Sequence, residues 1–393
     1  MINRRLSKTT LFLFASGCLS FILSFNSCGD NYPEHVIDGN SINDVVLSVN
    51  SPDLEIIQIR SSKPMKGISD YYSFGDHLFL VSADGGTVYH VQGDSVVSIL
   101  DKKGRGREEY LRVQCLAYSE KDSILYVKDA DSEKILKYQG VNNKVIGVTM
   151  VEESIYITGF NLVDDNTLLA MGSLETSDYS SAKNGGLFSI SAVTGELLEE
   201  VMPLDYLSYS FLFTQDFVQC KDGLVFQKPG AEVNQIFLYK DGKLTDLYDF
   251  SYNKKWRIPK KIFKKGFDDE RAKMEFAQYR GENDYCVGAY MPMKVNDTLY
   301  FWSAPIMIDA DFVRPVLNVC YDGKINYYSN YSIPGTSLEV IPCFVWKEKY
   351  ACLIEGVADD YIDDSAELSA LGRQVLDILN KNNGNPIIML FKK

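Results

Sequence analysis

Short hydrophobic runs of four or five residues recur along the chain from Val45 onward, and each follows a turn with Gly, Asp, Asn or Lys. One such run is 78–81, Leu-Phe-Leu-Val, which follows Gly75 and Asp76. Runs of this length between turn residues are typical of β-strands. Most are followed, after a further turn, by another run of the same kind. The pattern therefore predicts an all-β protein built from repeated antiparallel units.

The residues that open these repeated runs define a repeat length. They are Leu78, Leu125, Leu168, Leu224, Leu299 and Tyr350. Successive positions are 47, 43, 56, 75 and 51 residues apart. Repeats of roughly 40–50 residues with about four strands each are typical of propeller blades. The spacing predicts a six-bladed β-propeller with four-stranded blades over residues 44–393, with an array of β-sandwiches or a two-domain all-β protein as the alternative.

The longest interval contains an insertion, residues 253–284, that the repeat does not need. Its first part is strongly basic, and Asp268 and Asp269 then open a stretch with a helical pattern. The candidate contact residues in the basic part are Trp256, Lys260, Lys261, Lys264 and Lys265. One interpretation is an arm that contacts an acidic partner, an anionic glycan or lipid head groups. The other is that its aromatic residues dock on the propeller while its Lys side chains pair with acidic residues there.

The two ends of the propeller region suit ring closure. Strand-like runs lie at 45–60, and a final strand is expected at 387–391. Between the last repeat and that strand, residues 363–380 have the apolar spacing of a helix, with Asp364 as the expected N-cap and Glu367 three residues later. An early strand that joins the last blade would remove exposed sheet edges, so we expect the termini to close the ring.

Two segments resemble a known family. Residues 101–110 read Asp-Lys-Lys-Gly-Arg-Gly-Arg-Glu-Glu-Tyr, strand-like runs begin at 125–129, and the chain ends with Asn-Pro-Ile-Ile-Met-Leu-Phe at 385–391. This resembles the NHL-like (TolB-like) six-bladed β-propeller lipoproteins of Bacteroidetes. Their usual loop is Gly-x-Gly-Pro-Gly-Glu-Tyr, and positions 107–108 depart from it with Arg-Glu. The resemblance implies a propeller in the cell envelope and supplies no catalytic residues.

The first 27 residues read as a lipoprotein signal peptide. A basic start precedes an apolar stretch of 15 residues at 11–25, shorter than the roughly 20 that span a bilayer. A small residue directly before Cys28 resembles a lipobox, so Cys28 is the predicted lipidation site. Cys18 is the rival site, and secretion with ordinary cleavage is the alternative.

Residues 28–43 contain Pro, Gly, Asp and Ser and read as a tether between the anchor and the fold. The expected location is the cell envelope, at the outer membrane on its periplasmic or surface face, with membrane contact through the lipid anchor alone. The formal net charge of -13 argues against a nucleic-acid partner, because phosphates require a basic surface. An envelope protein or a glycan is the expected partner.

Candidate chemistry is sparse. The sequence has 3 His, which excludes a His-rich metal site, and no hydrolase or phosphate-loop motif occurs. Residues 129–133 begin like a calcium loop, but Lys134 stands where that loop needs Gly, so we interpret them as a blade turn. We therefore expect no metal and no cofactor. Abundant carboxylates leave open an enzyme of lyase, lactonase or glycosidase type with an acidic or metal site at the channel mouth.

A basic loop follows the first predicted blade. Besides two Lys it contains Arg105, Arg107 and Arg112, which suit a carboxylate or sulfate on a ligand. The alternative is a solvated turn whose cations pair with Glu108 and Glu109.

Six Cys follow the predicted signal peptide. Most lie singly inside apolar runs, which is typical of buried thiols. Cys343 and Cys352 differ, because a hairpin turn centred on Lys347 and Glu348 would place them opposite each other as a close pair. Taken together, the sequence predicts a lipid-anchored envelope propeller that binds a ligand or a protein, with an enzyme as the alternative.

Overall fold

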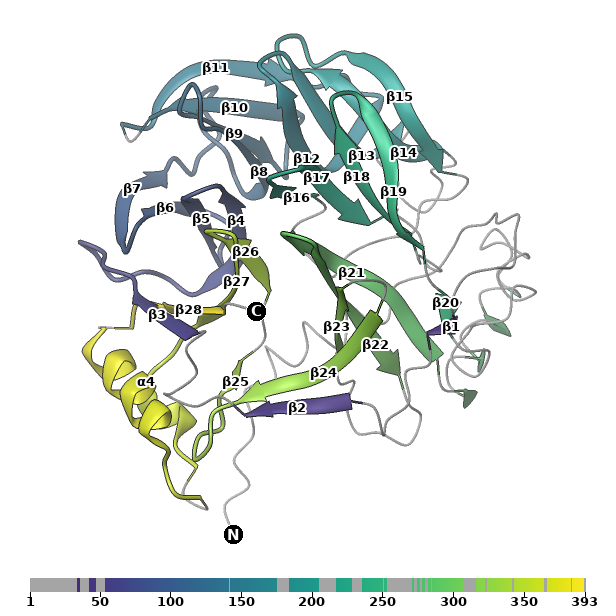
Figure 1. The fold of residues 1–393 in the computed structure, drawn as a ribbon. Coiled ribbons are helices and arrows are strands. Elements are labelled where there is room, and N and C mark those ends of the chain that lie inside the picture. The colour runs from purple at the N-terminus through teal and green to yellow at the C-terminus, as the bar shows by residue number, and fades with distance from the viewer. Residues whose placement is uncertain are drawn as a thin grey trace.

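The computed structural model describes most of the chain between Leu54 and Phe391, preceded by two short strands. The described residues are 34–35, 42–46, 54–140, 142–174, 184–204, 217–227, 235–249, 251–252, 271, 274–275, 278–279, 282–283, 285–306, 316–321, 324–340, 343–363, 366–382 and 384–391. They form mainly antiparallel sheets that surround a common axis as a β-propeller (Figure 1).

The first sheet shows how the sequence builds one unit. Its strands, paired antiparallel in chain order, are β4 (Ile68–Phe74), β5 (His77–Ser82), β6 (Thr87–Gln92) and β7 (Ser95–Asp101). Gly75 and Gly93, both with positive φ, make the first and third turns. In β5 and β6 nearly every residue is buried. These strands therefore read as continuous apolar runs, because both of their faces are covered.

Three further four-stranded sheets repeat this meander. Their strands are β8 (Val113–Ser119), β9 (Ile124–Asp129), β10 (Lys134–Gln139) and β11 (Lys144–Met150); β12 (Ile155–Asp164), β13 (Thr167–Leu174), β14 (Asn184–Ser191) and β15 (Leu197–Leu204); and β16 (Phe217–Cys220), β17 (Gly223–Gln227), β18 (Gln235–Lys240) and β19 (Lys243–Asp249). The predicted opening residues Leu125, Leu168 and Leu224 are buried in the second strand of each sheet.

The next sheet is larger. Its strands are β21 (Tyr285–Val295), β22 (Thr298–Ile306), β23 (Val316–Tyr321) and β24 (Lys324–Ser332), with β2 (Ile42–Val46) and β25 (Glu339–Val340) both paired to β24. Among the described residues, five sheets have four strands and this one has six. The prediction of six four-stranded blades is therefore wrong here. The reason is that the edge of β24 is covered by β2, which begins at the end of the predicted tether and which a blade-length repeat does not reveal.

The termini close the propeller. The last four-stranded sheet combines β26 (Phe344–Trp346), β27 (Lys349–Ile354), β28 (Ile387–Phe391) and β3 (Leu54–Gln58), in that order. In Figure 1 the yellow β28 lies beside the purple β3. The first strands of successive sheets contact one another in the order β4, β8, β12, β16, β21 and β26, and β26 contacts β4 again. The expected closure through an early and a late strand is confirmed.

The C-terminal helix is shorter than expected. After the 3-10 turn η3 (Ala358–Tyr361), α4 spans Ala370–Lys381. Its N-cap is Ser369, whose Oγ accepts a hydrogen bond from Gly372 N at 3.0 Å, so the prediction of Asp364 as the cap is wrong. Ser369 itself is extended, and its N donates to Pro334 O at 3.1 Å.

Apolar clusters fill the spaces between neighbouring sheets. One cluster joins the first three sheets through residues such as Phe79, Leu116 and Ile157. A second joins the six-stranded sheet, the closing sheet and α4. The remaining pair β1 (Glu34–His35) and β20 (Ser251–Tyr252) places another part of the predicted tether beside the start of the insertion.

Candidate functional site

Turns from five sheets surround one cavity at an end of the propeller axis. Each of these turns follows the first strand of its sheet: β4, β8, β16, β21 or β26. The cavity has a volume of about 660 Å³. We call it the channel-mouth cavity, and its lining residues are 73–75, Tyr118, Glu120, 219–222, 294–297, Val345, Lys347 and Glu348. Because the first strands contact one another in a ring, their turns converge on the axis.

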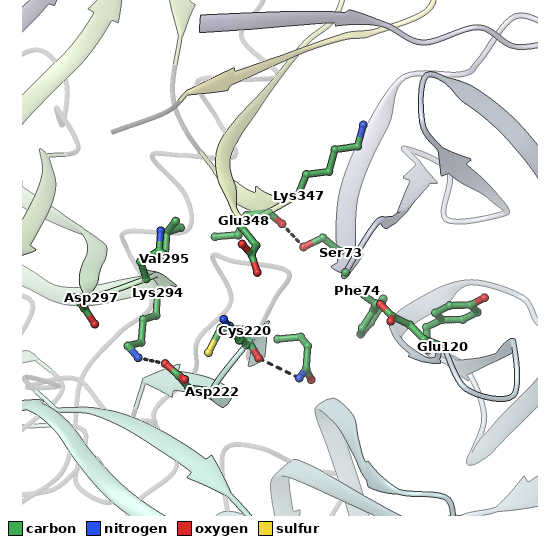
Figure 2. A pocket seen from close by; sticks show the side chains of 16 residues that line it. Ser73, Phe74, Glu120, Cys220, Asp222, Lys294, Val295, Asp297, Lys347 and Glu348 are labelled. Atoms are coloured by element: carbon green, nitrogen blue, oxygen red, sulfur yellow. Dashed lines mark hydrogen bonds and ion pairs between the residues drawn. The ribbon is translucent and has the colours of Figure 1, made fainter. Parts of the chain in front are cut away.

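One wall of the channel-mouth cavity carries an ion pair. Lys294, at the end of β21, donates to the Asp222 carboxylate from the turn after β16 (Figure 2). This hydrogen bond lowers the pKa of Asp222 from its ordinary value. The neighbouring Cys220 thiol donates to Gly223 O at 3.1 Å, and burial raises its pKa. Cys220 is therefore a weak nucleophile, because a raised pKa keeps the thiol protonated.

The opposite wall is aromatic and acidic. Phe74 and Tyr118 lie with ring centroids 6.2 Å apart, and Glu120 lies beside Phe74 (Figure 2). Gly75 has a φ of 56°, and a Cβ there would collide with the Glu120 carboxylate. The left-handed turn favours Gly75, whereas the exposed Glu120 side chain could move aside for a Cβ.

A histidine pair lies behind the aromatic wall. His77 Nδ1 and His90 Nε2 are hydrogen-bonded at 2.8 Å. The Tyr118 ring centroid lies 4.8 Å from that of His77, and the buried His90 stacks on Phe79 at 4.4 Å. Burial, with a smaller contribution from the charge of His77, lowers the pKa of His90 to about 4. The pair therefore supports the Tyr118 side of the cavity from within the first sheet.

The third wall is a hairpin turn with unusual backbone angles. Lys347 and Glu348 have φ of 53° and 56°, a conformation that favours Gly or Asn. Lys347 extends away from the cavity, and its Nζ lies 4.4 Å from the centroid of the Trp346 ring. Glu348 is directed into the cavity (Figure 2). Non-Gly residues in this conformation cost roughly 1 kcal/mol or more each and cluster at functional sites.

The predicted basic loop lies elsewhere. It follows Asp101, which pairs with Thr87 at the end of the first sheet remote from Gly75. Arg105 and Arg107 are exposed, and Arg112 forms an exposed ion pair with Asp131 at 3.7 Å. A hydrogen bond between a side chain and the backbone holds the loop: the Glu109 carboxylate accepts from Gly106 N at 2.8 Å. The structure therefore does not bring these three Arg to the channel-mouth cavity, and Glu109 bonds backbone instead of Arg.

The predicted thiol pair lies on the closing sheet. Cys343 immediately precedes β26, Cys352 lies in β27, and Cys343 N donates to Ala351 O at 2.8 Å. Both are free thiols, and burial raises the pKa of each, that of Cys343 to about 11. The register pairs Phe344 with Ala351, which places the two Cys at neighbouring positions across the hairpin.

Several candidate residues lie outside the described residues. These are Cys28, Trp256, Lys260, Lys261, Lys264 and Lys265. Within the insertion, the described positions Arg271, Met274, Glu275, Gln278, Tyr279 and Glu282 are helical. The basic arm and the lipid anchor stay predictions.

The described ranges contain neither a metal-binding cluster nor a helix that could span a membrane. No group of three or more His, Cys, Asp or Glu side chains there is arranged to hold a metal ion. The calcium-like segment is a turn in which Asp129 Oδ1 accepts from Leu111 N at 3.2 Å and Arg112 N at 3.3 Å. No helix in the same part of the chain is long and apolar enough to span a bilayer.

No protein-family model and no curated protein matches the chain. Among solved structures, a protein of Bacteroides fragilis NCTC 9343 described as exported is similar with a TM-score of 0.62 and 12% identity, covering 91% of this chain and 100% of its own. A DUF4221 family member of Bacteroides vulgatus ATCC 8482 has a TM-score of 0.49 and 9% identity over 87% of this chain and 98% of its own. BamB of Moraxella catarrhalis has a TM-score of 0.38 and 8% identity over 86% of this chain and 98% of its own. At such identities the first likeness supports the fold alone, and the other two carry no weight.

Proposed function

We propose that this chain is a propeller that binds a small polar ligand in the channel-mouth cavity. The observation that supports this is the convergence of turns from five sheets on a space of about 660 Å³ lined by aromatic and charged side chains. Ligand sites are typically concave spaces of roughly 300–1,000 Å³ with a few polar groups on a rigid frame. Turns on a closed propeller provide such a frame, because the sheets fix where each turn lies.

The proposal predicts that filling the cavity abolishes binding. Gln219 is exposed, lies in β16 and lines the cavity, so Gln219→Trp places a bulky ring there without disturbing the core. We expect the melting temperature of the wild type to rise with at least one member of a panel of amino acids, dipeptides, amino sugars and disaccharides. The rise should be lost in Gln219→Trp.

Gln92→Trp is the matched control for this experiment. Gln92 is exposed at the end of β6 and does not line the cavity. A panel compound whose binding survives in Gln219→Trp, or is lost equally in Gln92→Trp, would place the site elsewhere and contradict the proposal.

We also propose that the protein is lipid-anchored in the cell envelope, as in the NHL-like lipoproteins that its sequence resembles. The support is the apolar stretch at 11–25, after which Asn26 and the small residue Ser27 lead to Cys28. Labelling of cells with a radioactive fatty acid should mark the wild type and leave Cys28→Ser unlabelled. Label retained in Cys28→Ser would assign the modification to Cys18 or another site.

No arrangement in the described residues favours the enzyme alternative over binding. The described residues contain no group of three or more His, Cys, Asp or Glu side chains that could hold a metal ion. An enzyme would require converging catalytic groups at the same channel mouth.

A further inference from the structure

The charges of the channel-mouth cavity do not balance. Its charged lining residues are the acids Glu120, Asp222, Asp297 and Glu348 and the bases Lys221, Lys294 and Lys347. Lys294 is neutralised by Asp222. Lys347 points away, toward Trp346 and Gly93 O, which its Nζ approaches to 3.5 Å. Three carboxylates then face a single ammonium group, that of Lys221.

Two of these carboxylates are available to a ligand. Within the part of the chain that the structure describes, no hydrogen bond or ion pair engages the carboxylate of Glu120 or Glu348. Glu120 comes from the turn after β8 and Glu348 from the turn after β26. They flank the turn at Gly75, since β4 contacts both β8 and β26. Each carboxylate can therefore attract a cation in the cavity.

The aromatic wall also favours a cationic ligand. Phe74 and Tyr118 line the same side of the cavity as Glu120. The face of an aromatic ring attracts ammonium and guanidinium groups within about 6 Å. Tyr118 is held in place by its contacts with His77 and Phe79, whose ring centroids lie 4.8 and 5.0 Å from its own. A ring that is already fixed binds a cation without a loss of side-chain entropy.

We infer that the channel-mouth cavity takes a ligand that carries a primary ammonium group, attracted by the carboxylates of Glu120 and Glu348 and by the aromatic wall. This inference rests on the proposed function, since it names the chemistry of the ligand at that site. A Lys side chain of a peptide and an amino sugar both present this group. The carboxylates recognise the ammonium group in either source.

The test uses two matched pairs of probes in isothermal titration calorimetry. The first pair is Nα-acetyl-lysine amide and its Nε-acetylated form, and the second is glucosamine and N-acetylglucosamine. We expect the charged member of at least one pair to bind about ten-fold or more tightly than its acetylated partner. Binding of only one charged probe identifies the source of the ammonium group.

Variants of the two carboxylates complete the test. Glu120→Gln and Glu348→Gln should each weaken binding of the charged probe about ten-fold, because each keeps the side-chain shape and removes the charge. Glu153→Gln changes an exposed acid outside the cavity and should bind like the wild type. Unchanged melting temperatures in all three variants would exclude a structural cause.

Two outcomes would overturn the inference. If acetylated or anionic probes bind as well as charged ones, and Gln219→Trp still blocks them, the ligand is not an amine but the proposed function stands. If no probe of any charge binds, the inference and the proposed function both fall.

Discussion

Deletion of residues 387–393, which include β28, is expected to leave no cooperatively folded protein. Ile387, Ile388, Met389 and Leu390 are fully buried, and the strand pairs with β27 on one side and β3 on the other. Truncation of a single buried aliphatic side chain costs about 2–5 kcal/mol, whereas a whole domain is stable by about 5–15 kcal/mol. The loss of β28 also removes the only strand between β27 and β3 in the described sheet, so the ring opens.

Circular dichroism melts and size-exclusion chromatography would measure this effect. Deletion of residues 392–393 alone is the control and should melt like the wild type, because it leaves β28 whole. A graded variant, Ile388→Ala, should lower the free energy of unfolding by about 2–5 kcal/mol. A monomeric deletion variant with an unchanged melting temperature would show that ring closure does not depend on β28.

The repeat of the fold was readable because its cause is local. Buried second strands such as β5 must be apolar on both faces, and each begins after a polar turn, so Leu78 and its equivalents stand out in the sequence. The final strand at 387–391 was readable for the same reason. The extra strands of the larger sheet were not, because β2 pairs with a strand far away in the sequence, Ile42 with Tyr327 of β24. Pairing at that distance leaves no periodic signal.

Fewer residues of the candidate site could be predicted from the sequence, because a site made by converging turns has no local motif. Lys347 and Glu348 were interpreted only as the centre of a hairpin, and Glu120, Asp222 and Lys294 were not singled out. A signal was present, since each turn before a repeated opening residue occupies the same place in its blade and therefore faces the same channel end. The Arg-rich loop was conspicuous by composition, yet it lies at the other end of the first sheet.

The histidine pair behind the cavity is expected to make stability fall in mild acid. His90 contacts His77 and Phe79 from β5 and Tyr118 from β8, and the register places Ser98 of β7 beside it. Burial lowers its pKa from 6.5 to about 4. Between pH 6.5 and about 4, His90 therefore binds a proton in the unfolded chain but not in the folded chain. The free energy of unfolding therefore falls as the pH falls, by about 3 kcal/mol from this group alone.

Glu355 acts in the opposite direction. Glu355 directly follows β27. Its Oε1 accepts a hydrogen bond from Ile68 N, at the start of β4, at 2.8 Å. Burial raises its pKa from 4.5 to about 6, in spite of that hydrogen bond. The folded chain then holds the proton more firmly than the unfolded chain, so stability falls as the pH rises through this range.

Urea denaturation at a series of pH values between 4 and 7 separates the two groups. His90→Phe keeps a ring that can stack on Phe79 and removes the titration, so it should lose less stability than the wild type when the pH falls from 7 to 4. Glu355→Gln retains an acceptor for Ile68 N and should lose more. Parallel curves for His90→Phe and the wild type would mean that His90 titrates normally in the folded protein.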